Sequence, residues 1–320
     1  MSILDERIDK AKTICILGHQ NPDGDCIGST LAIYNYIINK YADSKVVRPY
    51  LDEFSKKYLI LPNADKISND DKDATKFDLA IIVDSSNAER LSSYLRYFEE
   101  AKDSIIFDHH ENNTFPAKVS VINPESIATC ELLYPFLDKS FIDKNVAMCL
   151  YTGLATDSGI FRYKATNRKT FMMAAELIDY GFDFTNLLDT IVFDNSVKQR
   201  KAQGLVFDRL KLICKGQVSY SYILDEELCE LGLEKNDIDN IIVYLREIEN
   251  IKVAAFAYQV GNAVFKFSLR SKFDEYNVAK FAKEHDGGGH QLAAGCMYYG
   301  DIDTISKKFE KDMAEFIESK

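Results

Sequence analysis

Residues 13–28 read TICILGHQNPDGDCIG, and this stretch decides the fold of the first half of the chain. Its first five residues, 13–17, are mainly apolar and predict a short buried strand. Apolar residues at helical spacing follow over 27–40 and predict a helix. Between the two, Pro22 and Gly24 predict a tight turn. A strand, a tight turn and a helix in this order begin a βαβ unit, which predicts a parallel sheet covered by helices.

The same alternation continues through the first half of the chain. Short runs of apolar and β-branched residues alternate with longer runs that carry apolar residues at helical spacing. The predicted strands are 13–17, 46–50, 79–83, 104–107 and 119–122, and the predicted helices are 27–40, 129–137, 145–156 and 169–180. This pattern predicts an α/β fold with a doubly wound, mainly parallel sheet.

The rest of the chain predicts a second, smaller domain. A chain of 320 residues suits two domains at roughly 150 residues each. We assign residues 1–185 to the first domain, 186–210 to a helical connector and 211–320 to an α+β domain, and we expect a cleft between the domains. The second domain has predicted helices at 225–231, 237–247, from Tyr276 and after Asp301, and predicted strands at 253–260 and 263–268.

The composition excludes several classes of protein. Hydrophobic residues make up 46% of the chain, which suffices for buried cores and excludes a disordered protein. The net charge is −11, so the chain lacks the general basic character of a protein that binds duplex nucleic acid. No apolar run reaches the roughly 18 residues of a membrane span. The seven cysteines include no CxxC pair, which is typical of reduced core residues. We therefore expect a cytoplasmic protein with no membrane partner.

All five histidines lie in or beside clusters of Asp or Gly. The first cluster, GHQNPDGDCIGS, places His19, Asp23 and Asp25 on the turn between the first predicted strand and its helix, which we expect to begin at residue 27 or 28. The alternation of the two aspartates about Gly24 can direct their carboxylates at two metal ions. Imidazole and carboxylate ligands favour Mn²⁺ or a related divalent ion. We see no soft thiolate ligand and interpret Cys26 as a packing residue.

Further acidic and imidazole side chains end two other predicted strands. Asp84 ends LAIIVD, and Asp108, His109 and His110 end SIIFDHH. Ligands bind at the carboxyl ends of the strands in open α/β sheets, so these residues should converge on the first cluster. Asp157 follows a predicted helix in the phrase TDSGIF, where we expect the chain to turn into a strand.

Each of these residues also has a simpler explanation. Asp84 is also explained as a simple cap of the next helix, and a histidine pair beside an aspartate is also explained as a hydrogen-bonded surface turn. Such explanations would have to hold separately for every member of the set. We therefore favour a metal site.

Four phrases, HQNPDGDCIGS, VDSSNAERL, FDHHENN and ATDSG, resemble the motifs of the DHH phosphoesterase superfamily. GGGHQLAAG at 287–295 is similar to the signature of the DHH-associated C-terminal domain of stand-alone NrnA-type oligoribonucleases and cyclic dinucleotide phosphodiesterases. The resemblance implies two Mn²⁺ ions, with Mg²⁺ or Co²⁺ as substitutes, about 3.5–4 Å apart and able to activate a bridging water. It assigns one ion to His19, Asp23 and Asp84, and the other to Asp25, Asp84, His109 and Asp157.

The resemblance also implies roles for residues that touch no metal. Asp108 would fix the tautomer of an imidazole, and His110 would face the scissile phosphate. In the second domain, Arg270 and His290 would bind a terminal phosphate, and the glycines Gly287, Gly288 and Gly289 would let backbone amides approach it. His285 and Asp286 depart from the pattern of many members, which bears on how a base or sugar is held.

The expected activity is hydrolysis of short nucleotides to mononucleotides. The candidate substrates are cyclic di-AMP, the linear dinucleotide pApA and short RNA fragments (nanoRNA). A phosphatase acting on 3'-phosphoadenosine 5'-phosphate is a close alternative, and a non-catalytic nucleotide-binding regulator is a remote one, because no ligand of the expected set is missing. The resemblance further suggests a homodimer.

Overall fold

The computed structural model describes residues 1–238 and 240–320. The chain divides into two compact units, Met1–Asp194 and Asn195–Lys320. The division falls inside the segment 186–210 that we predicted as a connector. Each unit is described by itself below, and the predicted cleft stays a prediction. Among the described helices, none combines the length and the apolar character needed to cross a membrane.

The first unit is built on a five-stranded parallel sheet, as the sequence predicted. The strand order is β2-β1-β3-β4-β5. The strands are β1 (Thr13–Leu17), β2 (Val46–Tyr50), β3 (Leu79–Val83), β4 (Asp103–Asp108) and β5 (Val119–Ile122). From β1 the chain crosses to β2 on one side, and from β3 it crosses to β4 on the other. This reversal makes the gap between the ends of β1 and β3 the switch point at which α/β sheets bind ligands.

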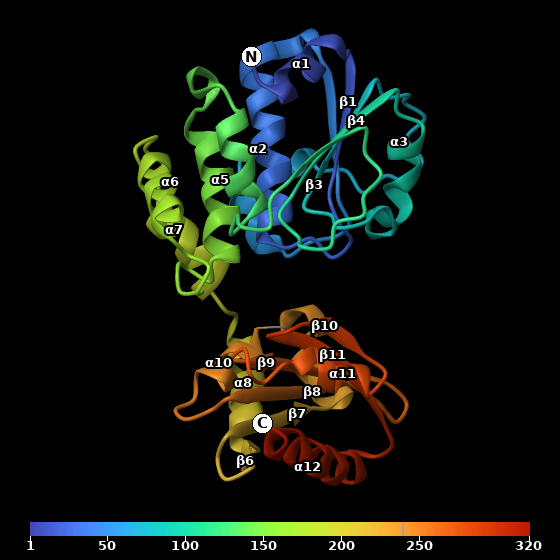
Figure 1. Ribbon diagram of the computed structural model, residues 1–320, viewed down its shortest axis with the longest axis vertical. Helices are drawn as coiled ribbons and strands as arrows, with labels where there is room; N and C mark the ends of the chain where they lie inside the picture. The colour runs from blue at the N-terminus through green and yellow to red at the C-terminus, as the bar shows by residue number, and fades with distance from the viewer. Residues whose placement is uncertain (239) are drawn as a thin grey trace. The chain divides into compact units, whose positions relative to one another are not determined.

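Helices cover both faces of this sheet. They are α1 (Ile3–Lys10), α2 (Gly24–Tyr41), α3 (Leu95–Glu99), α4 (Thr129–Leu133), α5 (Lys144–Asp157), α6 (Arg168–Ile178) and α7 (Phe184–Leu188). Figure 1 shows α2 and α5 side by side on one face and α3 on the other. Alternate residues of β1 point to opposite faces of the sheet. Ile14 and Ile16 pack in the core under α2 and α5, whereas Cys15 and Leu17 pack in an aromatic cluster on the α3 side.

Two local predictions near the expected site were wrong. Helix α2 begins at Gly24 rather than at residue 27 or 28, because the Asp23 side chain accepts the backbone N–H groups of Asp25 and Cys26 and caps the helix there. After Asp157 the chain forms turns, not a strand. Gly159, Ile160 and Phe161 have φ values of 58°, 56° and 60°, a left-handed conformation that does not occur in a strand.

The second unit is an α+β domain, as predicted, on a six-stranded mixed sheet of order β10-β11-β9-β8-β7-β6. Its strands are β6 (Lys211–Ile213), β7 (Val218–Ile223), β8 (Val253–Gly261), β9 (Val264–Ser271), β10 (Gly288–His290) and β11 (Ala293–Tyr299). Its helices are α8 (Val197–Asp208), α9 (Asp225–Leu231), α10 (Ile241–Glu247), α11 (Val278–Lys283) and α12 (Ile302–Glu318). Side chains of α11 and α12 pack on one face of the sheet, and side chains of α8, α9 and α10 pack on the other.

Candidate metal centre and phosphate-binding face

The first two predicted ligands lie at the switch point of the first sheet. His19 follows β1, and Asp84 follows β3 directly. Their side chains meet, with 3.3 Å between His19 Nε2 and Asp84 Oδ2, and both residues are at most 4% exposed. Asp84 has a φ of 54°, so the chain bends sharply at the strand end and turns its carboxylate toward β1.

The histidines that follow β4 approach the same carboxylate. His109 Nε2 lies 3.6 Å and His110 Nδ1 lies 3.7 Å from Asp84 Oδ1. His109 Nε2 also lies 3.2 Å from Asp157 Oδ2, at the end of α5. Asp84, at the end of β3, is therefore surrounded by three imidazoles from the ends of β1 and β4, the strands on either side of β3, as a carboxylate that bridges two ions would be.

Backbone carbonyls set the orientation of two of these rings. His19 Nδ1 lies 2.8 Å from Gln20 O, and His109 Nδ1 lies 3.2 Å from Ser126 O. A carbonyl only accepts hydrogen bonds, so each Nδ1 carries the proton and each Nε2 is left to face the carboxylates. Metal-binding histidines are held in this way.

Asp108 and His110 form a second, adjoining arrangement. Asp108 Oδ1 lies 2.7 Å from His110 Nδ1, and Asn113 Nδ2 donates to Asp108 Oδ2 over 2.5 Å. Asp108 is fully buried. Its carboxylate fixes the His110 tautomer and directs Nε2 away from itself, which is the arrangement expected of a positioning residue.

Asp25 is held by the start of α4. Its carboxylate accepts the backbone N–H groups of Thr129 over 2.6 Å and Cys130 over 3.0 Å. Glycine makes this placement possible, because a Cβ on Gly153 of α5 would lie 2.3 Å from Asp25 Oδ1. The close approach of α2 and α5 thus carries Asp25 to His109 and Asp157.

The cluster places more negative charge in a buried space than it can hold without cations. Burial and the charge of Asp84 raise the pKa of Asp25 to about 7, and burial raises the pKa of Asp157 well above its usual value. Burial opposes ionisation of Asp84 as well, but the nearby histidines lower its pKa to about 2. Burial disfavours charged imidazoles, yet their acidic neighbours raise the pKa of His19 to about 12 and of His109 to about 10. Protons balance the charge here, and divalent cations could replace them.

The donor set fits divalent cations. Three groups of side chains each bring their ligand atoms within 4.8 Å of one another: His19, Cys26 and Asp84; Asp84, His109 and His110; Asp25, His109 and Asp157. The structure thus brings together the residues that we assigned to the second ion. Of the set assigned to the first ion, His19 and Asp84 meet, whereas Asp23 lies at the edge. The Asp23 side chain is 58% exposed, and its Oδ1 lies 3.9 Å from His19 Nε2.

The second unit arranges its predicted residues in rows across a sheet. Arg270 of β9 is opposite Ala293 of β11, and Ala293 is opposite His290 of β10. Opposite residues of antiparallel strands share a face, so Arg270 and His290 stand on one face with only a methyl group between them. In the neighbouring row on this face, Ser268, Gly295 and Gly288 are opposite one another. We call this face, made by Ser268, Arg270, Gly288, His290, Ala293 and Gly295, the small-residue face.

Glycine occupies three consecutive positions, 287–289, for different physical reasons. A Cβ on Gly287 would lie 2.1 Å from Gly295 O. Gly289 has a φ of 139°, and a Cβ there would lie 2.6 Å from Ala293 O. Tight packing of β10 on β11 therefore demands glycine at both positions. At Gly288 a Cβ would meet no atom within 4 Å, so only this glycine keeps the small-residue face open.

Comparison with known families gives one match to each unit. The DHH family, N-terminal domain, matches residues 13–154, and the DHHA1 domain matches residues 215–315. The chain contains a DHH domain and a DHHA1 domain. The DHH match contains His19, Asp84 and His109 and ends three residues before Asp157, and the DHHA1 match contains the small-residue face. The two domains, together with the relatives described next, make the protein a DHH phosphoesterase, which is a hydrolase.

Relatives of this protein cover nearly its whole length. A probable bifunctional oligoribonuclease and PAP phosphatase NrnA from Streptococcus mutans is 28% identical over 92% of this chain and 92% of its own. A bifunctional oligoribonuclease and PAP phosphatase NrnA from Bacillus subtilis is 25% identical over 93% of this chain and 96% of its own. The crystal structure of an exopolyphosphatase-related protein from Bacteroides fragilis has the same fold, with a TM-score of 0.89 at 24% identity over 98% of this chain and 95% of that chain.

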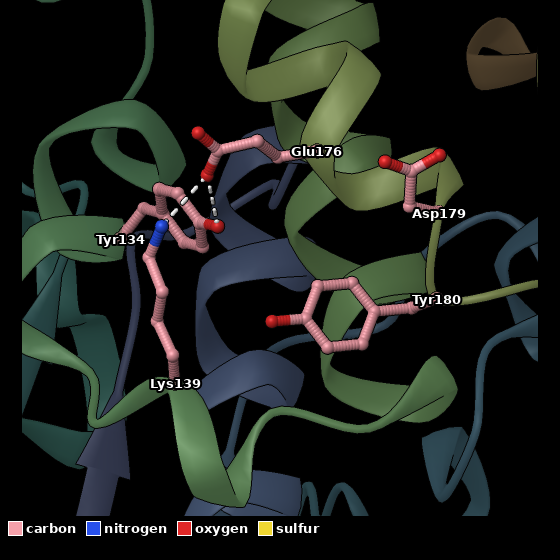
Figure 2. Close-up of a pocket in the computed structure, with 5 residues that line it drawn as sticks. All are labelled: Tyr134, Lys139, Glu176, Asp179 and Tyr180. Carbon is pink, nitrogen blue, oxygen red and sulfur yellow. Dashed lines mark hydrogen bonds and ion pairs between the residues drawn. The ribbon is translucent and has the colours of Figure 1, made fainter.

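A pocket elsewhere in the first unit has no part in the cluster. It has a volume of about 320 Å³ and is lined by Tyr134, Lys139, Glu176, Asp179 and Tyr180. Figure 2 shows Tyr134 and Lys139 both reaching the Glu176 carboxylate, at 2.7 Å and 2.9 Å. Lys139 and Tyr134 lower the pKa of Glu176, so its charge is already balanced. These contacts tie the end of α6 to the segment after α4, which is a structural role.

Sequence reasoning missed three contributors to the site of the DHH domain. Thr129 Oγ1 donates to Asp84 Oδ1 over 3.1 Å, Asn113 holds Asp108, and Cys26 joins His19 and Asp84. For Cys26 the signal was its position, because a helix that begins at Gly24 makes Cys26 part of the first turn. Asn113 ends the motif FDHHENN, but nothing in that motif indicates its contact with Asp108, and Thr129 lies outside the four motifs.

Proposed function

We propose that this protein is a metal-dependent phosphodiesterase that hydrolyses short nucleotides, above all linear dinucleotides such as pApA and short RNA fragments, to mononucleotides. The observation that carries the proposal is the cluster of carboxylates and imidazoles at the ends of β1, β3 and β4. Such a cluster holds divalent cations, and the protein is a phosphoesterase by family. The full-length NrnA relatives, described as oligoribonucleases, support this substrate class.

The residues of the cluster have distinct roles in this proposal. His19, Asp84, Asp25, His109 and Asp157 would hold two Mn²⁺ ions, with Asp23 at the edge of the set. Two such ions, when bound, activate water and neutralise the phosphoryl oxygens on both sides of the displacement. Burial excludes bulk water around Asp84 and so strengthens each charge interaction there.

His110 meets the scissile phosphate in this proposal. Asp108 accepts the Nδ1–H of the ring over 2.7 Å and thereby leaves Nε2 as the atom that contacts substrate. Through this contact a change at Asp108 would affect turnover although Asp108 touches neither substrate nor metal.

The DHHA1 domain would bind the end of the substrate that does not react. Arg270 presents a planar fork that suits bidentate phosphate binding, and His290 stands in the same row. Gly288 and Gly295 add no side chain between this row and the rest of the face, so a planar base or sugar could lie against the backbone. A net charge of −11 supplies no extended basic track, which favours short substrates over long strands.

A second candidate is a phosphatase acting on 3'-phosphoadenosine 5'-phosphate. The NrnA relatives from Streptococcus mutans and Bacillus subtilis are described as both oligoribonuclease and PAP phosphatase. One metal cluster can serve both substrates, since each presents a phosphoester beside an adenosine. Cyclic di-AMP, a homodimeric state and a cytoplasmic location stay predictions.

The test is product analysis by ion-exchange chromatography with Mn²⁺ present. Cyclic di-AMP, pApA, a five-nucleotide RNA and 3'-phosphoadenosine 5'-phosphate are offered separately at equal concentration. We expect AMP from pApA and mononucleotides from the RNA. Release of phosphate from the bisphosphate would establish the second candidate as an additional activity.

Two variants make the test specific to the site. Asp84→Asn should abolish turnover of every substrate. Asp103→Asn is the matched control, since Asp103 begins β4 at the opposite end of the sheet and pairs with Arg7; it should leave turnover near the wild-type value. If the wild type cleaves none of the four substrates, or if Asp84→Asn cleaves them normally, the proposed function is wrong.

A further inference from the structure

A basic and aromatic segment follows the last residue of the metal cluster in the chain. Between Asp157 and Glu176 the sequence has four basic residues and no acidic one, although the net charge of the chain is −11. The basic residues, all exposed, are Arg162, Lys164, Arg168 and Lys169. Three exposed or half-buried rings alternate with them, namely Phe161, Tyr163 and Phe171. Basic side chains interleaved with aromatic rings form the kind of surface that binds single-stranded nucleic acid.

The turn after α5 places one of these rings near the metal cluster. The carbonyl of Ser158 accepts the N–H group of Tyr163 over 3.0 Å, which closes the turn. A Cβ on Gly159 would lie 2.4 Å from the Tyr163 ring, so this ring packs directly on the backbone two residues after Asp157. Asp157 itself lies 3.2 Å from His109. A ring that is 40% exposed therefore lies close to the proposed ions.

The start of α6 is fixed near the same cluster. Thr170 Oγ1 donates to Glu131 Oε1 of α4 over 2.8 Å, and Lys169 Nζ lies 3.4 Å from Glu131 Oε2. Two residues earlier in α4, the N–H group of Thr129 donates to the carboxylate of Asp25. One short helix thus contacts both a metal-site carboxylate and the first turn of α6. The exposed face of α6 therefore begins beside the metal cluster.

This exposed face of α6 is both apolar and basic. Arg168, Phe171 and Met172 lie three and four positions apart, so they share one face of the helix. Phe171 is 55% exposed and Met172 is 51% exposed. Phe161 of the preceding turn stacks on Phe171, with 5.5 Å between the ring centroids and 28° between the ring planes. Turn and helix thus form one surface. We call this surface, made by Phe161, Tyr163, Arg168, Phe171 and Met172, the aromatic platform.

A second copy of this chain is the other occupant that an exposed phenylalanine and methionine suggest. A symmetric interface brings the same patch of both copies together. Here it would bring two sets of four basic residues together, and the segment between Asp157 and Glu176 has no acidic residue to offset them. The phosphates of an RNA supply the opposite charge, and its bases supply rings for stacking. The charge of the segment therefore favours RNA over a second copy.

We propose that the aromatic platform binds the part of a short RNA that extends beyond the scissile phosphate, with bases stacked on Tyr163 and Phe171 and phosphates paired with the basic side chains. This inference rests on the proposed function, which places the scissile phosphate at the metal cluster and one end of the substrate on the DHHA1 domain. A dinucleotide leaves one nucleotide on the other side of the scissile phosphate, whereas a five-nucleotide RNA leaves four. The platform therefore favours RNA fragments over pApA. Its basic part spans only residues 162–169, which suits a few nucleotides and not a long strand.

The first test is the steady-state kinetics of the full chain with Mn²⁺ on pApA and on a five-nucleotide RNA. Phe171→Ala should raise KM for the RNA by about five- to hundredfold, the loss expected for one stacked base, and should change KM for pApA by less than about twofold. Ile38→Ala is the control, because it removes an exposed apolar side chain from the far end of α2. It should leave both KM values unchanged.

The second test measures the salt dependence of RNA binding by fluorescence anisotropy in the Asp84→Asn protein, which should not cleave the RNA. In a plot of log affinity against log salt concentration, adding Arg168→Gln should reduce the slope by about 0.7, the value of one phosphate contact to a single strand. Lys10→Gln is the matched control, since Lys10 is exposed and precedes β1 at the end of the sheet opposite His19; it should keep the original slope. Arg168 is exposed, so this variant should fold even if Phe171→Ala does not.

The outcomes separate this inference from the proposed function. Equal changes of KM for pApA and the RNA in Phe171→Ala would overturn the inference, as would an unchanged KM for the RNA or an unchanged salt slope in Arg168→Gln. A dimer that dissociates in Phe171→Ala, seen by sedimentation, together with an unchanged KM for the RNA would assign the platform to a second copy instead. A wild type that cleaves neither substrate would overturn the proposed function itself.

Discussion

Gly153→Ala should damage the metal centre from a position that touches no substrate. Gly153 lies in α5 where this helix crosses α2. An added Cβ would lie 2.3 Å from Asp25 Oδ1 and 2.4 Å from Cys130 Sγ. It would also lie 3.1 Å from the Asp25 Cα, so rotation of the side chain alone cannot relieve the clash. Either α5 moves away from α2 or the Asp25 carboxylate leaves the start of α4.

The loss of stability in Gly153→Ala follows from three contributions to the free energy of unfolding. Overpacking a buried site costs about 1–3 kcal/mol. Weakening one of the two N–H bonds that Asp25 accepts adds about 1.5–3 kcal/mol, because the acceptor is charged. Alanine returns roughly 0.5–1 kcal/mol through its better helix propensity. We therefore expect a net loss of about 1.5–5.5 kcal/mol in the free energy of unfolding of the first unit.

The assay is urea denaturation followed by circular dichroism, together with calorimetric titration of Mn²⁺. The affinity for the ion beside Asp25 should fall by at least about tenfold, as when other supports of metal ligands are lost. Gly204→Ala is the control: this glycine is also helical, in α8, and a Cβ there meets nothing within 4 Å. It should stabilise by about 0.5–1 kcal/mol. A Gly153→Ala protein with the unfolding midpoint and Mn²⁺ affinity of the wild type would refute the reasoning.

Three further predictions follow from the same geometry. Asp108→Asn should lower kcat by at least about tenfold with Mn²⁺ affinity unchanged, because it disturbs only the His110 tautomer; a change in Mn²⁺ affinity, measured by calorimetry, would contradict this. Gly288→Ala should fold normally and raise KM for pApA, whereas Gly287→Ala should unfold the second unit, as circular dichroism and kinetics would show. Without cations, the raised pKa values of Asp25 and His109 mean that the folded chain binds more protons than the unfolded chain. The urea concentration at the unfolding midpoint of the metal-free protein should therefore decrease as the pH is raised from about 5 to about 8. Added Mn²⁺ should raise this midpoint most at the upper end of that pH range. A midpoint that increases with pH would contradict the assignment.

The sequence predicted the first sheet well because its strands are short buried runs with clear ends. Four of the five strands have the predicted bounds, and the convergence of His19, Asp84 and His109 follows from parallel pairing alone. The second sheet was predicted less completely. β7 reads VSYSYI and β11 begins with small residues, so neither shows the apolar signal of a buried strand, although β7 is almost wholly buried and β11 is buried on one face. Tertiary packing decided these strands.

Which ligand serves which ion depended on a detail that periodicity does not show. We expected Asp23 and Asp25 to direct their carboxylates at two different ions from a turn that precedes the helix. The Asp23 cap instead makes residues 24–26 the first turn of α2, where successive side chains point about 100° apart. Asp25 is thereby directed to α4 and α5, and Cys26 to Gly18 and His19.

The start of α2 thus directs neighbouring residues to different parts of the cluster. Asp25 lies with His109 and Asp157, whereas Cys26 lies beside His19 and Asp84. Asp84 takes part in both halves, with Oδ2 toward His19 and Oδ1 toward His109. A helix that began at Ile27 would leave Cys26 outside the first turn and remove this difference. The cap formed by the single residue Asp23 therefore sets the directions of two side chains in a site assembled from residues more than a hundred positions apart.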